Sequence, residues 1–140
     1  MYKRQINNKK KLIETIKKYK PECIFNVAAE THVDRSIDNP DNFMQTNIIG
    51  TCNVVKACSE KNIKLIYFSS NYVYPGKKGY YNEKSAVLPF NNYAWSKLGG
   101  EAAVQMYKNS LILRICMTEK PFVHKKAFGN VKLNFIFGMI

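Results

Sequence analysis

The sequence predicts an α/β protein whose sheet is parallel and doubly wound. Three short apolar segments, at residues 23–29, 63–70 and 111–116, lack the alternation of half-exposed strands, so we expect buried strands there. Two longer segments with helical spacing, at residues 40–61 and 92–108, separate them. Strands that alternate with helices along the chain favour a parallel sheet with the helices packed against it.

The first helix is expected at residues 8–19, ahead of the first strand. Lysines cover its outer side, and Pro21 stops it because proline disfavours helical geometry in the residue before it. Its apolar face consists of Leu12, Ile13, Ile16 and Tyr19. We also expect a short further strand near the end of the chain, at residues 130–140.

The second helix is expected to begin at Asn39-Pro40, after a polar loop, and to run to about Lys61. Asparagine is a preferred N-cap, and proline suits the first helical position. The side chains expected to be buried include Phe43, Met44, Ile48, Cys52 and Val55. In the third helix, Gly99 and Gly100 each cost roughly 1 kcal/mol relative to alanine, so we expect another backbone to pack closely there, from this chain or a partner subunit.

The composition fits one folded domain, residues 1–140, in a reducing compartment. With 46% hydrophobic residues the chain can bury a core, and it has neither an apolar run of about 18 residues nor a secretory leader. His32 and His124 have no second ligand at a suitable spacing, and no C-x-x-C pair occurs, so we expect no metal site. We expect a cytoplasmic protein with no membrane partner. The scattered cysteines, read as reduced thiols, are Cys23, Cys52, Cys58 and Cys116.

The net charge is +12, from 22 basic and 10 acidic residues. A nucleic-acid binder would explain such an excess, yet 19 of the basic residues are lysines and three are arginines, the residue preferred for forked phosphate and base contacts. The lysines are also spread along the chain, and 15 Asn and 13 Ile indicate A/T-rich codon usage. We expect no nucleic-acid partner.

Polar residues that follow the predicted strands form a candidate site, because ligands of doubly wound sheets bind at the carboxyl ends of strands. Ser70 closes the second strand, and Tyr93 and Lys97 follow 23 and 27 residues later. Four residues make about one helical turn, so Tyr93 and Lys97 are expected on one face of the third helix. The segments expected at this edge are 26–35, 69–76 and 117–121.

Five sequence blocks in register carry a resemblance to a known family. The blocks are NVAAETHVDRS, NIIGT, YFSSNYVYPG, YAWSK and LILR. Over about residues 20–121 the chain resembles the extended short-chain dehydrogenase/reductase family, the NAD(P)-dependent sugar-nucleotide epimerases, dehydratases and reductases. The resemblance implies a Rossmann-like fold, NAD or NADP as the cofactor and a nucleotide sugar as the substrate.

The resemblance also implies roles for individual residues. Ser70 would bind the substrate oxygen, Tyr93 would transfer a proton, and Asn47 would complete a relay or brace the strand. The Lys97 ammonium, helped by the nicotinamide ring, would lower the pKa of the Tyr93 phenol from its ordinary value of about 10. The residues implied to be catalytic are Ser70, Tyr93, Lys97 and Asn47. Those implied to contact the cofactor are Ala28, Ala29, Tyr93 and Lys97, with Lys97 on the nicotinamide ribose.

Within this family the chain looks most similar to the dTDP-4-dehydrorhamnose reductases, which transfer a hydride and a proton to a 4-keto sugar. The 4,6-dehydratases carry an Asp-Glu pair directly after the hydroxyl residue, whereas Asn71 and Tyr72 stand here. A 4-epimerase uses the same three residues and remains an alternative. A second alternative is that the chain is a non-catalytic remnant that serves as an interaction domain.

The family's cofactor loop, G-x-x-G-x-x-G after a first strand, does not occur in this sequence. We therefore expect a partial Rossmann-like domain that lacks the first strands and most of the carboxyl-terminal sugar-binding region. An uncovered apolar strand edge favours association, so a homodimer or a complementing chain is expected. The isolated chain is expected to bind NAD(P) weakly or not at all and to be inactive.

Overall fold

The structure, a computed structural model, describes residues 6–77 and 79–116. Strands β1 (Cys23–Asn26), β2 (Lys64–Ser70) and β3 (Ser110–Ile115) form one parallel sheet in the order β1-β2-β3. The carboxyl ends of all three strands therefore lie at the same edge of the sheet. This confirms the predicted α/β class with a parallel sheet.

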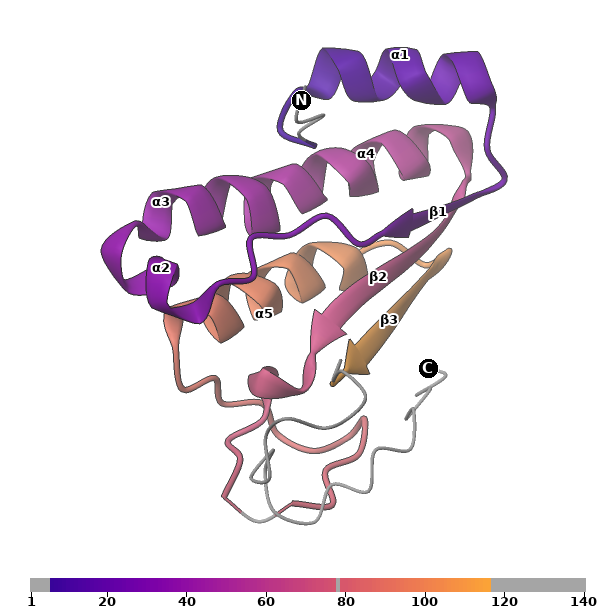
Figure 1. Cartoon of the computed structure of the whole chain (residues 1–140). Coiled ribbons are helices and arrows are strands. Elements are labelled where there is room, and N and C mark those ends of the chain that lie inside the picture. The colour runs from indigo at the N-terminus through magenta and orange to yellow at the C-terminus, as the bar shows by residue number, and fades with distance from the viewer. Residues whose placement is uncertain (1–5, 78, 117–140) are drawn as a thin grey trace, which may run out of the picture.

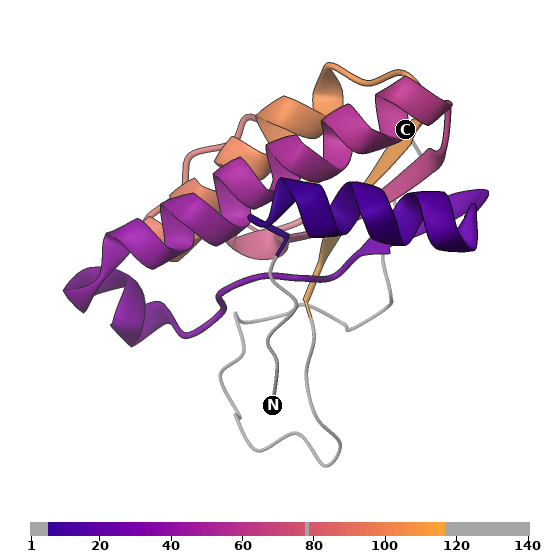
Figure 2. The same cartoon turned by 90° about the horizontal axis from the view of Figure 1, so that it is seen from above.

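Three helices lie on one side of this sheet (Figure 1). They are α1 (Lys9–Tyr19), α4 (Thr51–Lys61) and α5 (Asn92–Gln105). Helices α4 and α5 contact the strands and run side by side, and α1 packs against α4 (Figure 2). Helix α1 begins as predicted, because the Asn8 side chain accepts a hydrogen bond from the Lys11 N–H at 3.1 Å.

The helical stretch before β2 is longer and less regular than predicted. Helix α2 (Val33–Asp38) occupies the predicted polar loop, and at six residues it is too short to show a helical repeat in the sequence. Helix α3 (Pro40–Phe43) begins at the predicted position, where the Asn39 side chain accepts from the Asn42 N–H at 3.5 Å. The chain then widens into a π-helix, η1 (Met44–Gly50), before it continues as α4.

Burial along this stretch follows the prediction except at one position. Phe43 is buried, and Ile48, Cys52 and Val55 are partly buried, as expected. Met44 is 45% exposed, so its predicted burial is wrong. Adjacent helical residues point in different directions, and the inward direction here is taken by Phe43.

The core lies between the sheet and the helices. Leu65 and Tyr67 of β2 are fully buried in it, together with Val54 of α4. The opposite side of β1 is open in the part of the chain that the structure describes, where Phe25 is 60% and Val27 is 68% exposed. The prediction that this strand is buried on both faces, and that it extends to Ala29, is therefore wrong for the described residues.

A long loop at the carboxyl edge joins β2 to α5. It begins with the short 3₁₀-helix η2 (Asn71–Val73), and the Leu88 N–H donates to the Val73 carbonyl at 2.9 Å. The Asn91 side chain caps α5 by accepting from the Ala94 N–H at 2.7 Å, and α5 ends at Gln105 rather than at Lys108.

The predicted segment 117–121 and the predicted strand 130–140 lie outside the described residues. Within the described ranges, no helix is long and apolar enough to cross a membrane.

Candidate active site

Strand β2 and helix α5 bring Ser70 and Tyr93 together at the carboxyl edge of the sheet. Ser70 is the last residue of β2, and its hydroxyl accepts a hydrogen bond from the Tyr72 N–H at 3.2 Å. Tyr93 lies in the first turn of α5. Burial raises the pKa of Tyr93, interaction with the Ser70 side chain opposes that rise, and nearby Tyr72 adds to it. The Tyr93 ring lies 6.2 Å from the ring of Tyr72, whose N–H is bonded to the Ser70 hydroxyl, so Tyr93 lies beside the turn that begins at Ser70.

Lys97 lies one turn further along α5 and is only 3% exposed. Burial lowers its pKa from 10.5 to about 8, and the charge of Glu101 acts in the opposite direction. Its ammonium lies 4.5 Å from the centre of the Tyr67 ring, a cation–π contact. Lys97 does not contribute to the shift of the Tyr93 pKa here, because burial of the phenol dominates and the ammonium lies over Tyr67. The expected lowering, which included the charge of the nicotinamide ring, stays a prediction for the chain with cofactor bound.

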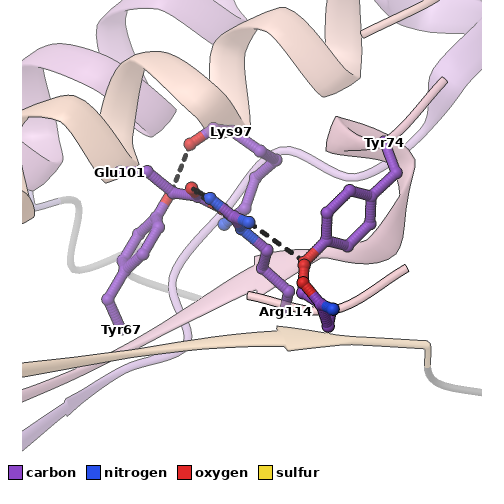
Figure 3. Close-up of polar contacts among 6 residues, drawn as sticks. Tyr67, Tyr74, Lys97, Glu101 and Arg114 are labelled. Carbon is purple, nitrogen blue, oxygen red and sulfur yellow. Dashed lines mark hydrogen bonds and ion pairs between the residues drawn. The ribbon is translucent and has the colours of Figure 1, made fainter. Parts of the chain in front are cut away.

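Lys97 belongs to a group of interacting side chains that we call the buried anchor (Figure 3). Its members are Tyr67, Lys97, Glu101 and Arg114. Arg114 of β3 donates from Nε to both carboxylate oxygens of Glu101 at 3.1 Å, and from Nη2 to Oε2 at 2.8 Å. The Tyr67 hydroxyl donates to the backbone carbonyl of Lys97 at 3.2 Å. Sequence reasoning missed Glu101 and Arg114. The available signals were the position of Glu101 one turn after Lys97 and the arginine of the LILR block.

Asn47, buried in η1, ties the loop after β1 to α5. Its Oδ1 accepts from the Glu30 N–H at 2.9 Å, and its Nδ2 donates to the Glu30 carbonyl at 3.0 Å and to the Ser96 hydroxyl at 2.8 Å. The Ser96 hydroxyl donates in turn to the Tyr93 carbonyl at 2.7 Å. Asn47 thus ties the loop after β1 to α5, and its expected role in a relay or in bracing the strand stays a prediction. It lies in a π-helix, and π-helical turns often occur at functional sites.

The paired glycines of α5 allow a close approach within the chain. A Cβ at Gly100 would collide with the Tyr67 hydroxyl and would lie 2.7 Å from the Asn47 carbonyl oxygen. A Cβ at Gly99 would lie 2.8 Å from the Ile48 side chain. The expectation that another backbone packs here is confirmed at Gly100, and that backbone is η1 of the same chain.

The loop after β1 carries the predicted cofactor contacts. Ala28 and Ala29 are half-buried and follow the carboxyl end of β1, at the same sheet edge as Ser70. Their side chains are single methyl groups, and the Asn47 bonds to Glu30 hold the backbone beside them.

Across residues 6–77 and 79–116, no group of three or more His, Cys, Asp or Glu side chains is placed to hold a metal ion.

A parallel α/β sheet whose strands are joined by helices on one side defines the class of the molecule, which is a Rossmann-type α/β protein. The chain belongs to the RmlD substrate binding domain family, which it matches over residues 2–134. The resemblance to the extended short-chain dehydrogenase/reductase family is thus confirmed.

Similar proteins include three named dTDP-4-dehydrorhamnose reductases. That of Salmonella typhimurium is 34% identical over 100 residues, which cover 71% of this chain and 33% of that protein. The crystal structure from Clostridium acetobutylicum is 28% identical with a TM-score of 0.77, covering 81% of this chain and 41% of that one. The structure from Bacillus anthracis, in complex with NADP, is 31% identical with a TM-score of 0.76. The match covers 79% of this chain and 40% of that one. The chain spans about a third of the length of the curated relatives it matches.

Proposed function

We propose that this chain carries the catalytic residues of an NAD(P)-dependent reductase that acts on a 4-keto sugar nucleotide, in the manner of the dTDP-4-dehydrorhamnose reductases. One observation carries the proposal: Tyr93 lies beside the turn that begins at Ser70, at the carboxyl edge of the sheet, with Lys97 one turn beyond it on α5. The names of the relatives support a sugar nucleotide as the substrate class.

In this proposal Ser70 orients the substrate and Tyr93 is the proton donor. The Ser70 hydroxyl donates a hydrogen bond to the keto oxygen, and the Tyr93 phenol transfers its proton to the same oxygen. Burial raises the pKa of Tyr93, so the phenol keeps its proton at neutral pH until the substrate takes it. NAD(P)H, when bound, supplies the hydride to the carbonyl carbon.

Lys97 supports both the tyrosine and the cofactor. With a pKa of about 8 it is mostly protonated at neutral pH. Its positive charge would stabilise the phenolate that remains on Tyr93 after proton transfer, and Lys97 and Tyr93 would hold the nicotinamide ribose. Ala28 and Ala29 would leave room for the cofactor against the loop after β1.

The residues next to Ser70 favour reduction over dehydration. Elimination of water needs an acid and a base at two neighbouring carbons, and in the dehydratases a carboxylate pair follows the hydroxyl residue. Here Asn71 and Tyr72 follow Ser70, and neither side chain is a carboxylate. Transfer of a hydride and a proton to one carbonyl group needs no such pair.

The experiment supplies the cofactor-binding unit in trans, because a G-x-x-G-x-x-G loop does not occur in the sequence. The full chain is co-expressed with polypeptides that carry the family's strand–GxxGxxG–helix unit and its carboxyl-terminal sugar-binding region, and NADPH oxidation is followed with dTDP-4-dehydrorhamnose. We expect turnover by the co-expressed chains, reduced about 10²- to 10⁴-fold in Tyr93→Phe. Tyr80→Phe is the matched control, because Tyr80 is 92% exposed, and it should keep the wild-type rate. No sugar-dependent oxidation by the co-expressed chains, or equal rates in wild type and Tyr93→Phe, would overturn the proposal.

A further inference from the structure

Arg114 contacts two separate parts of the site (Figure 3). Its Nε and Nη2 donate to the Glu101 carboxylate at 2.8–3.1 Å, and its Nη1 donates to the Tyr74 hydroxyl at 3.0 Å. The Glu101 side chain is 4% exposed and that of Arg114 is 20% exposed. A guanidinium has a fixed fork of donors, so the two partners are held in a fixed relation to each other.

Glu101, the first partner of Arg114, connects it to Lys97. Glu101 follows Lys97 by one turn of α5, so the two side chains share a face of the helix. The charge of Glu101 raises the pKa of Lys97 against the larger lowering by burial. Tyr67 completes the arrangement from β2, because its hydroxyl bonds the Lys97 carbonyl and its ring lies beneath the Lys97 ammonium.

Tyr74, the second partner of Arg114, connects it to the loop that follows Ser70. The Tyr74 hydroxyl donates to the Asn82 carbonyl at 2.9 Å, and the Tyr74 ring stacks on the Tyr81 ring at 4.9 Å with 6° between the planes. The Tyr81 hydroxyl accepts from the Lys77 N–H at 3.0 Å. These contacts fold the loop onto Tyr74, and Arg114 fixes Tyr74 to β3.

We propose that Arg114 is a positioning residue that sets Lys97 through Glu101 and sets the Tyr74–Asn82 loop through Tyr74, so that one side chain aligns the two sides of the site. The assignment of Lys97 to a reaction rests on the proposed function. The positioning itself does not, since it follows from contacts in the protein alone. Arg114 is suited to this role because β3 is paired with β2, whose carboxyl end carries Ser70.

The first measurement is the titration of Lys97, followed by ¹³C NMR of its side chain in the full chain without cofactor or sugar. Glu101 on α5 and Tyr67 on β2 face Lys97, and Arg114 on β3 acts on it through Glu101. Tyr93 lies one turn earlier on the same helix. In the wild type the midpoint should lie at about pH 8. Arg114→Gln should raise it, because the Glu101 carboxylate then loses its competing cation. Glu101→Gln should lower it, because the opposite charge is gone and Arg114 remains.

These opposite directions separate positioning from a general loosening of the fold. Loosening would expose Lys97 and raise its midpoint in both variants toward the ordinary value for lysine. Shifts in the same direction, or no shift in either variant, would overturn the proposal.

The second measurement uses Tyr74→Phe, which removes one hydroxyl and keeps the ring. We expect hydrogen exchange at the Lys77 and Asn82 amides to become several-fold faster, while the Lys97 midpoint stays at about 8. Arg114→Gln should speed the same amides, and the exposed control Tyr80→Phe should leave them unchanged. If Arg114→Gln does not fold, the proposal is tested by the Lys97 midpoint in Glu101→Gln and by amide exchange in Tyr74→Phe.

Unchanged exchange in Tyr74→Phe would overturn the loop half of the proposal. Neither readout needs turnover, so a failure of the proposed reductase function leaves both results interpretable.

Discussion

The proposed reacting groups, Ser70 of β2 and Tyr93 of α5, differ in charge from the buried anchor, which joins α5 to β2 and β3. Ser70 and Tyr93 are uncharged, and Tyr93 is only partly buried, at the edge of the sheet. Lys97 and Glu101 are charged and almost fully buried, and they are held by Tyr67 and Arg114. The comparison shows that the groups proposed to meet the substrate carry little of the electrostatic cost. That cost falls on the side chains that hold them in place.

Buried charges are stable only when each has its partner. Removing one member of a buried pair leaves the other without compensation, which is more costly than the pair itself is favourable. Tyr93 has no comparable dependence, because its partly buried phenol is neutral and needs no opposite charge. Substitutions in the two regions should therefore differ in size and, in one case, in sign.

The largest effect is expected from Glu101→Ala. This change leaves the buried Lys97 and the partly buried Arg114 as two cations without their carboxylate. We expect the free energy of unfolding to fall by about 3–5 kcal/mol, which urea denaturation measures. Tyr93→Phe is the comparison and should change it by less than about 0.5 kcal/mol. Equal losses in the two variants would remove the distinction between the regions.

Lys97→Met should increase the free energy of unfolding, in contrast to the decrease expected for Glu101→Ala. The pKa of Lys97 falls from 10.5 to about 8 on folding, so below pH 8 the folded state holds a proton at a cost of roughly 3 kcal/mol. Between these pKa values the unfolded chain binds more protons, and the wild type therefore gains stability as pH rises through this window. The advantage of Lys97→Met should be largest below pH 8 and vanish above about 10.5.

Thermal unfolding of both proteins across this pH range tests that prediction. An advantage that does not depend on pH would show that packing, and not the charge of Lys97, is responsible.

A smaller effect is expected from Gly100→Ala. The added methyl group meets the Tyr67 hydroxyl and the Asn47 backbone, neither of which can shift freely. Overpacking of this kind costs about 1–3 kcal/mol, against a gain of roughly 1 kcal/mol from helix propensity. Gly99→Ala is the matched control, because it meets the half-buried Ile48 side chain, which can change its rotamer. Denaturation midpoints that rank Gly99→Ala below Gly100→Ala would contradict the packing described here.

Local chemistry in the sequence predicted much of the arrangement around α5. Asn39-Pro40 marks the start of α3 because capping and proline geometry act within a few residues. The spacing of Tyr93 and Lys97 follows from the helical repeat alone. The cost of glycine in a helix pointed to a close contact at Gly100, and the structure places η1 there.

Features that depend on distant residues could not be predicted in the same way. Helix α2 is a single short stretch without a repeat, and the widening at η1 has no compositional signal. The Arg114–Glu101 pair joins a strand to a helix, so neither residue alone indicates its partner. Phe25 and Val27 are apolar and look buried in the sequence, yet exposure depends on which elements cover the sheet.

The central claim is that the Ser70 hydroxyl and the Tyr93 phenol meet at one point, and the titration of Tyr93 tests it most directly. Its pKa can be followed by ¹³C NMR of the ring in wild type, Ser70→Ala and the control Ser69→Ala. Interaction with Ser70 opposes the burial-induced rise of this pKa, so Ser70→Ala should raise it further, whereas Ser69→Ala should not. An unchanged Tyr93 pKa in Ser70→Ala would show that the two hydroxyl groups do not meet and would contradict the account.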